Sequence, residues 1–271
     1  MTATTRDLSG VVTGAGGADA TNLAEPIATA CQVLAETGLA PNVLGHVSVR
    51  LAGGEVLIRC RGPRERGLAF TTAEDARRIT LAGRPVDTGA WSVPNEWPIH
   101  TAILARRPDV TAVVHAHPAA VVTMSLAGLP WLPIVGAYDI PATRIAAGGV
   151  PVWPRAVLVN SPELGDNLSS CLAGRPVVVL HGHGLVAVGT GEPEHALAEA
   201  VTNAVAVDSL ARMTLAVRAA GAVAAPIADE DLAALPDLGS GFTVETMWRH
   251  LVARTAARGH TVSSTAGSHT S

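Results

Sequence analysis

Residues 110–118 read VTAVVHAHP, a run of β-branched and small residues that ends at a proline. This composition predicts a short β-strand, in which side chains alternate between the two faces of a sheet. His115 and His117 are two residues apart, so we expect both imidazoles on the same face. Such a pair is typical of a metal site, although two buried histidines with ordinary hydrogen-bond partners are the alternative.

A second histidine pair occurs in residues 176–189, PVVVLHGHGLVAVG, where two apolar runs flank a centre of histidine and glycine. The runs predict paired or bent strands, and the glycines let the backbone turn sharply and approach a bound ion. Either His181 or His183 can then supply a third imidazole. Three neutral histidines with an open position suit zinc, iron or manganese.

Glu96 is the carboxylate that we expect beside these histidines. It lies at the start of a predicted helix over residues 95–106, where the positive end of the helix dipole stabilises a negative charge. His100 is four residues further along the same helical face. It can orient the carboxylate, or it is a structural histidine bonded to a neighbouring loop.

The remaining patterns outline one domain over residues 23–257. Residues 1–22 and 258–271 are rich in small and polar residues, and we expect both tails to be disordered because they cannot bury enough apolar area. Apolar spacing, caps and turn residues predict the elements of the domain. These are a helix over 22–37 that stops at Gly38, a hairpin of strands 47–51 and 55–59, a helix over 161–172 and a long helix over 194–220.

Composition removes several classes of function. All 19 basic residues are arginines, whereas a Schiff-base aldolase, a pyridoxal-phosphate enzyme or a P-loop hydrolase needs a lysine amine. The net charge of -4 argues against nucleic acid as a partner, and three cysteines are too few for a disulfide framework. No apolar run predicts a secretory signal or a membrane span. We therefore expect a soluble cytoplasmic protein with neither nucleic acid nor membrane as a partner.

Four segments, in this order, resemble the class II aldolase/adducin family. They are 45–50 (GHVSVR), 95–100 (NEWPIH), 105–118 (ending in HAHP) and 183–184 (HG). The resemblance spans about residues 25 to 220 of the chain. It implies an α/β fold, with a single three-layer α/β/α domain around a largely antiparallel sheet. It also implies a homotetramer with active sites between subunits, and one divalent metal ion, Zn, Fe(II) or Mn, in each subunit.

The resemblance also assigns the residues of the site. His115, His117 and His183 match the three metal-binding histidines of the family. His183 is preferred over His181 because the family ligand directly precedes a glycine, so His181 becomes a substrate-facing residue or a neighbour of the ligands. Glu96 matches the catalytic acid/base, which can also touch the metal.

The chain departs from the sugar-phosphate aldolases of this family where they hold the phosphate. Their asparagine, Thr-Gly turn and serine pair are replaced by His46, the run 59–62 (RCRG) and the dipeptide 94–95 (PN). Guanidinium groups grip a planar carboxylate bidentately, so Arg59, Arg61 and His46 are expected to bind a carboxylic acid. The alternative places both arginines on an exposed strand edge.

Tyr138 is the single tyrosine of the chain. Aldolases of the family use a tyrosine in this region as a proton donor, although a simple alignment places Ala137 at that position. Tyr138 is therefore a candidate catalytic residue, with an ordinary packing role as the alternative.

These departures resemble the family's decarboxylase branch, which includes pyridine-dicarboxylate decarboxylases and decarboxylating oxygenases of aminocoumarin antibiotic biosynthesis. We therefore predict a metal-dependent lyase that decarboxylates a 2-oxo or aromatic carboxylic acid without a phosphate group. Activation by a metal ion also suits a chain without lysine. One alternative is an iron-dependent oxygenase that oxidatively decarboxylates a (prenylated) 4-hydroxyphenylpyruvate-type acid. The other is an adducin-like binding module without catalysis.

Overall fold

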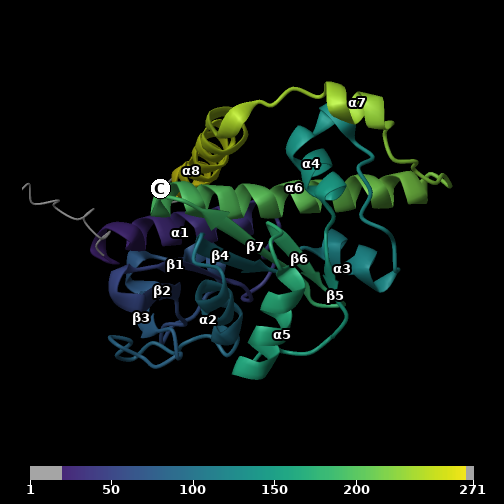
Figure 1. Ribbon diagram of the computed structural model, residues 1–271. Helices are drawn as coiled ribbons and strands as arrows, with labels where there is room; N and C mark the ends of the chain where they lie inside the picture. Colours follow the sequence, from purple (N-terminus) through teal and green to yellow (C-terminus); the bar gives the residue numbers. More distant parts are fainter. Residues whose placement is uncertain (1–19, 267–271) are drawn as a thin grey trace, which may run out of the picture.

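A sheet with the strand order β3-β2-β1-β4-β7-β6-β5 forms the centre of the computed structural model, which describes residues 20–266 (Figure 1). Neighbouring strands are antiparallel except for β5 and β6 at one edge. The strands are β1 (His46–Arg50), β2 (Glu55–Arg59), β3 (Ala76–Thr80), β4 (Val110–Ala116), β5 (Val152–Trp153), β6 (Val177–Leu180) and β7 (Gly184–Thr190).

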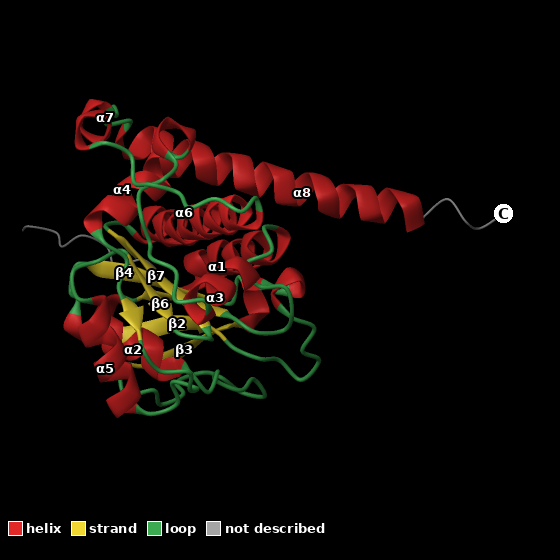
Figure 2. Cartoon of the chain, turned by 90° about the vertical axis from the view of Figure 1, so that its right-hand side faces the viewer, coloured by secondary structure: helices red, strands yellow, loops and turns green. Residues whose placement is uncertain are grey.

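Helices cover both faces of this sheet. One face carries α1, α3, α4 and α6, and the other carries α2 and α5, whereas α8 crosses the outer side of α1 and α6 and extends beyond the body of the domain (Figure 2). The predicted three-layer α/β/α domain with a largely antiparallel sheet is confirmed. The helices are α1 (Ala20–Glu36), α2 (Trp97–Arg106), α3 (Ala119–Leu126), α4 (Ile140–Gly148), α5 (Pro162–Leu172), α6 (Pro193–Ala219), α7 (Asp229–Ala234) and α8 (Met247–Ala266).

The alternation of strand side chains separates two apolar cores. On β1 and β2, Val47, Val49 and Leu57 belong to the core beneath α1 and α6. Val56 and Ile58, at the intervening positions of β2, belong to the core beneath α2 and α5. The parity of a residue on these strands therefore decides which helices it faces.

Most of the elements predicted from the sequence are present. The hairpin and the strand that carries His115 are confirmed, α1 begins two residues before the predicted start, and the hydroxyl of Ser161 caps α5 by accepting a bond from the Leu164 amide at 3.3 Å. The predicted boundary at residue 257 falls inside α8. Residues 1–19 and 267–271 lie outside the described residues, so the division into domain and tails stays a prediction.

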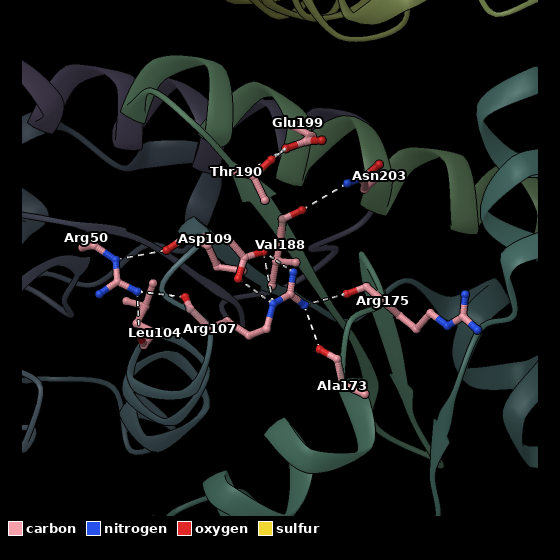
Figure 3. Close-up of polar contacts among 11 residues, drawn as sticks. Arg50, Leu104, Arg107, Asp109, Ala173, Arg175, Val188, Thr190, Glu199 and Asn203 are labelled. Atoms are coloured by element: carbon pink, nitrogen blue, oxygen red, sulfur yellow. Dashed lines mark hydrogen bonds and ion pairs between the residues drawn. The ribbon is translucent and has the colours of Figure 1, made fainter.

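Among the described residues, α6 alone is long and apolar enough to cross a membrane by length and composition. However, 56% of its most apolar window is buried inside the domain. Its polar side chains also hold the sheet, because Glu199 accepts bonds from Thr190 and Asn203 donates to the Val188 carbonyl at 3.1 Å (Figure 3). α6 is therefore a core helix, and the cytoplasmic location stays a prediction.

Arginine side chains anchor the C-terminal end of α2. Arg50 of β1 donates to the carbonyls of Leu104 at 2.5 Å and Arg107 at 3.0 Å, and the Arg107 side chain donates to the Ala173 carbonyl beyond α5 at 2.8 Å (Figure 3). These bonds satisfy carbonyls that a helix end leaves without an intrahelical partner. They hold in place the helix whose opposite end carries Glu96.

Candidate metal centre and active site

His115 lies at the centre of the site and is fully buried. It sits on β4 directly opposite His46 of β1, on the face covered by α2 and α5. Its Nδ1 is 2.9 Å from the carbonyl of Leu185 on β7. A carbonyl only accepts hydrogen bonds, so Nδ1 carries the proton and Nε2 presents a lone pair to the site.

Three more donor atoms converge on this lone pair. His115 Nε2 lies 2.9 Å from His117 Nε2 and 3.4 Å from Glu96 Oε2, and His183 Nε2 lies 3.6 Å from Glu96 Oε1. The four ligand atoms lie within 4.8 Å of one another. Burial lowers the pKa of His117 to about 2, so this ring is neutral, as a ligand must be.

This donor set fits a divalent ion. Metal–nitrogen bonds of about 2.0–2.1 Å in a tetrahedral site place donor atoms about 3.3 Å apart, close to the separations found here. The Nε2 atoms of His115 and His117, which face each other at 2.9 Å, also need a proton or a cation between them. His115, His117, His183 and Glu96 can therefore hold one metal ion.

Glycines on both sides of His183 let β7 bring this residue to β4. Gly182 has a φ of +62°, a conformation that side chains rarely adopt. At Gly184 a Cβ atom would collide with the carbonyl of Ala116, so a larger residue would push the two strands apart. Of the two candidates that the sequence offered, His181 and His183, the structure places His183 beside the other ligand atoms.

Glu96 directly precedes the first turn of α2, and its carboxylate is buried. Its Oε1 accepts a hydrogen bond from the Val159 amide at 3.0 Å. Burial by itself would raise the pKa of Glu96, but the imidazoles of His115, His183 and His46 beside the carboxylate outweigh it and hold this pKa well below its ordinary value. The side chain is therefore ionised at neutral pH.

A cavity of about 280 Å³ opens onto these groups. It combines the anionic Glu96, the cationic Arg61 and two partly exposed apolar side chains, Leu44 and Leu158. Such a wall can receive a flat acid, with a carboxylate at the guanidinium and the ring against the leucines. The lining residues are Leu44, His46, Arg61, Asn95, Glu96, His117, Leu158, Gly182 and His183.

Arg59 does not line this cavity, although the sequence paired it with Arg61. Its position on β2 gives it the parity of Leu57, so its side chain faces the α1 side of the sheet. There its guanidinium forms an ion pair with Glu65 at 2.5 Å and is only 3% exposed. The alternative of an exposed strand edge is also wrong for Arg59.

Tyr138 and His181 also do not line the cavity that Arg61 and Glu96 line within the same chain. Tyr138 ends the short 3-10 helix Gly136–Tyr138, is 73% exposed, and borders a separate hollow between α1, α6 and α8. The backbone amide of His181 donates to the Trp153 carbonyl at 3.0 Å. Their catalytic and substrate-facing roles stay predictions.

Within residues 20–266, His100 forms a hydrogen bond with neither the carboxylate of Glu96 nor a loop, contrary to both sequence interpretations. Its Nε2 lies 2.6 Å from His46 Nδ1 and its Nδ1 lies 2.6 Å from Ser48 Oγ. Burial lowers the pKa of His46 to about 4 and that of His100 well below its usual range. The sequence feature that could have indicated the contact of His100 with His46 and Ser48 is the spacing of these two residues, two apart on one strand.

Comparison with known proteins shows which family and which enzymes this chain is similar to. The family model "Class II Aldolase and Adducin N-terminal domain" matches residues 25–215. A 3,4-dihydroxyphthalate decarboxylase from Arthrobacter keyseri is 51% identical over 238 residues, which cover 86% of this chain and 94% of that protein. An L-fuculose phosphate aldolase from Escherichia coli K12 is 27% identical over 216 residues, 78% of this chain and 91% of the aldolase.

Solved structures agree on the fold. An aldolase II superfamily protein from Pseudomonas syringae superposes with a TM-score of 0.73 at 21% identity. The superposition covers 88% of this chain and 94% of that one. At this level of identity the likeness concerns the architecture alone.

Proposed function

The chain belongs to the class II aldolase and adducin family, and from this premise we propose that it decarboxylates 3,4-dihydroxyphthalate or a closely similar dihydroxylated aromatic acid. The expected enzyme class, a lyase acting on a carboxylic acid without phosphate, is confirmed by the decarboxylase that is 51% identical over most of both chains, and the cluster of Glu96 with three histidines supports the metal site. The oxygenase alternative gains no support from these relatives. The non-catalytic alternative is wrong.

The cluster of four metal-binding atoms carries this proposal, because three of its residues, Glu96, His117 and His183, line one cavity with Arg61. An aromatic diacid offers a carboxylate for the guanidinium, a ring for Leu44 and Leu158, and oxygens for the metal side of the cavity. A phosphate ester would meet a single arginine there. The cavity therefore suits a planar acid better than a sugar phosphate.

We assign His115, His117 and His183 as the residues that hold one divalent ion, with zinc, Fe(II) and manganese all compatible with these donors. When bound, the ion supplies a Lewis acid that polarises substrate oxygen and stabilises negative charge on the ring. Arg61 orients the substrate by holding the carboxylate that is retained.

Glu96 moves the proton in this proposal. Because the Val159 amide occupies Oε1, Oε2 is the oxygen that can take a proton from a ring hydroxyl. The bond between the ring and the departing carboxyl group then breaks, its electron pair stays on the ring carbon, and CO2 leaves. Oε2 returns the proton to that carbon, and the phenolate of the product takes a proton from solvent.

An anaerobic assay with 3,4-dihydroxyphthalate tests the proposal. We expect CO2 and a dihydroxybenzoate in equal amounts, and no turnover of phthalate, which lacks the hydroxyl groups, or of L-fuculose 1-phosphate. Turnover only in the presence of O2 would favour the oxygenase. Conversion of the sugar phosphate alone would overturn the proposal.

We further propose that the enzyme is a homotetramer with active sites between subunits. Leu44 and Leu158 at the cavity wall are 38% and 46% exposed in the single chain, which leaves apolar surface available for a neighbouring subunit. Light scattering should give the mass of four chains. A monomer of full activity would contradict the shared site.

A further inference from the structure

Three buried side chains form a continuous line behind the cavity. Ser48 Oγ lies 2.6 Å from His100 Nδ1, and His100 Nε2 lies 2.6 Å from His46 Nδ1. Ser48 and His100 are fully buried, and His46 is 3% exposed. The far end of the His46 ring, Nε2, lies beside Glu96 and the cavity.

One direction of the hydrogen bonds along this line is favoured over the other. An imidazole ring that is neutral has a single N–H. If the Ser48 hydroxyl donates to His100 Nδ1, then His100 Nε2–H donates to His46 Nδ1, and His46 must carry its own proton on Nε2. Every donor and acceptor from the Ser48 hydroxyl to His46 Nδ1 is then paired, and the Nε2–H of His46 lies at the cavity end of the line.

The opposite direction leaves two groups without partners. His100 would donate to Ser48 Oγ, whose hydroxyl hydrogen has no other acceptor within residues 20–266. His46 would also point an Nε2 lone pair at Glu96 Oε2, 3.9 Å away, where the carboxylate carries negative charge. A buried donor without an acceptor and two facing lone pairs are both unfavourable.

We propose that Ser48 and His100 are positioning residues that hold His46 as an Nε2–H donor for an anionic oxygen of the substrate. The separation of 3.9 Å from Glu96 Oε2 is too long for a hydrogen bond, so this N–H is available to a ligand. The identity of the ligand rests on the proposed function. The Nε2–H of His46 would face a carboxylate or phenolate oxygen of the substrate acid. Arg61 would bind the carboxylate at the other end of this acid.

Nitrogen-15 NMR of histidine-labelled protein tests the arrangement without any substrate. In the wild-type protein, both metal-free and loaded with diamagnetic zinc, we expect His46 protonated on Nε2 and not on Nδ1. Ser48→Ala adds no atom and removes the donor that sets the direction, so His46 should become a mixture of tautomers. Ser48→Thr keeps the hydroxyl and should restore the wild-type spectrum.

The binding of substrate gives the second readout. The loss of a uniformly aligned donor should raise KM in Ser48→Ala by about tenfold, with kcat and metal content close to wild type, and Ser48→Thr should rescue KM. His46 protonated on Nδ1 in the wild type, or a His46 spectrum unchanged in Ser48→Ala, would overturn the proposal. So would a loss of metal in Ser48→Ala. Failure of the decarboxylation itself would leave the NMR result readable, which separates the two proposals.

Discussion

The buried polar groups on the two faces of the sheet differ in their partners. On the face of α1 and α6, the buried charges are paired within the protein, Arg59 with Glu65 and Asp208 with Arg212. On the face of α2 and α5, His115, His117 and His183 direct nitrogen atoms at one point. The first face is held together by its own contacts, whereas the second leaves donor atoms for a partner from outside. Stability and chemistry are thus divided between the faces of one sheet.

The largest effect should come from the metal side of this comparison. His117→Ala removes one of the three proposed nitrogen ligands, and we expect turnover to fall at least about a thousandfold, or about 4 kcal/mol, because the Lewis acid is lost. Elemental analysis beside the activity assay measures both effects. His250→Ala, at an exposed position of α8, is the matched control and should retain metal and activity.

On the opposite face, the same kind of truncation should affect stability alone. Ile27 of α1 is fully buried, so Ile27→Ala should lower the free energy of unfolding by about 3 kcal/mol through lost burial and a cavity. Denaturant titration measures the loss. The kcat/KM of the folded fraction should stay within about twofold of wild type. A large change in kcat/KM would mean that the faces are coupled.

Arg59 and Arg61 provide the sharpest test of whether stability and substrate binding are separated between the two faces. Arg61→Ala should raise KM about 30-fold, or about 2 kcal/mol, with unfolding unchanged, because a charged hydrogen bond to substrate is lost. Arg59→Ala should instead lower stability, since it breaks the buried pair with Glu65, and leave KM alone. Steady-state kinetics and denaturation of both variants decide the matter. Equal effects on KM would return Arg59 to the substrate site.

The smallest effect concerns the helix beside the cavity. Ser161→Ala removes the N-cap of α5 and should cost about 1 kcal/mol in stability. Thermal unfolding measures this change, and Ser161→Asp, which can still cap the helix, should recover it. A fall in kcat larger than the fall in stability would show that α5 also positions the cavity wall.

Local patterns in the sequence predicted much of this molecule. The period of two predicted that His115 and His117 share a face of their strand, and the glycines around His183 predicted a sharp backbone turn beside the site. These features depend on neighbours within a few residues, where strand and turn geometry apply directly.

Contacts between distant segments were beyond these patterns. His100 meets His46 across 54 positions, and the Val159 amide meets Glu96 across 63. Arg59 was misplaced for a related reason. Its run resembles a substrate-binding segment, but the parity of β2 turns its side chain to the opposite face of the sheet.

The central claim is that one divalent ion, held by His115, His117 and His183, makes this cavity a decarboxylase. Titration of chelator-treated protein with a divalent metal, while CO2 release from 3,4-dihydroxyphthalate is followed without O2, tests it most directly. We predict no activity at the start and full activity at one ion per chain, with His117→Ala inert throughout. Full CO2 release from metal-free protein would contradict the account.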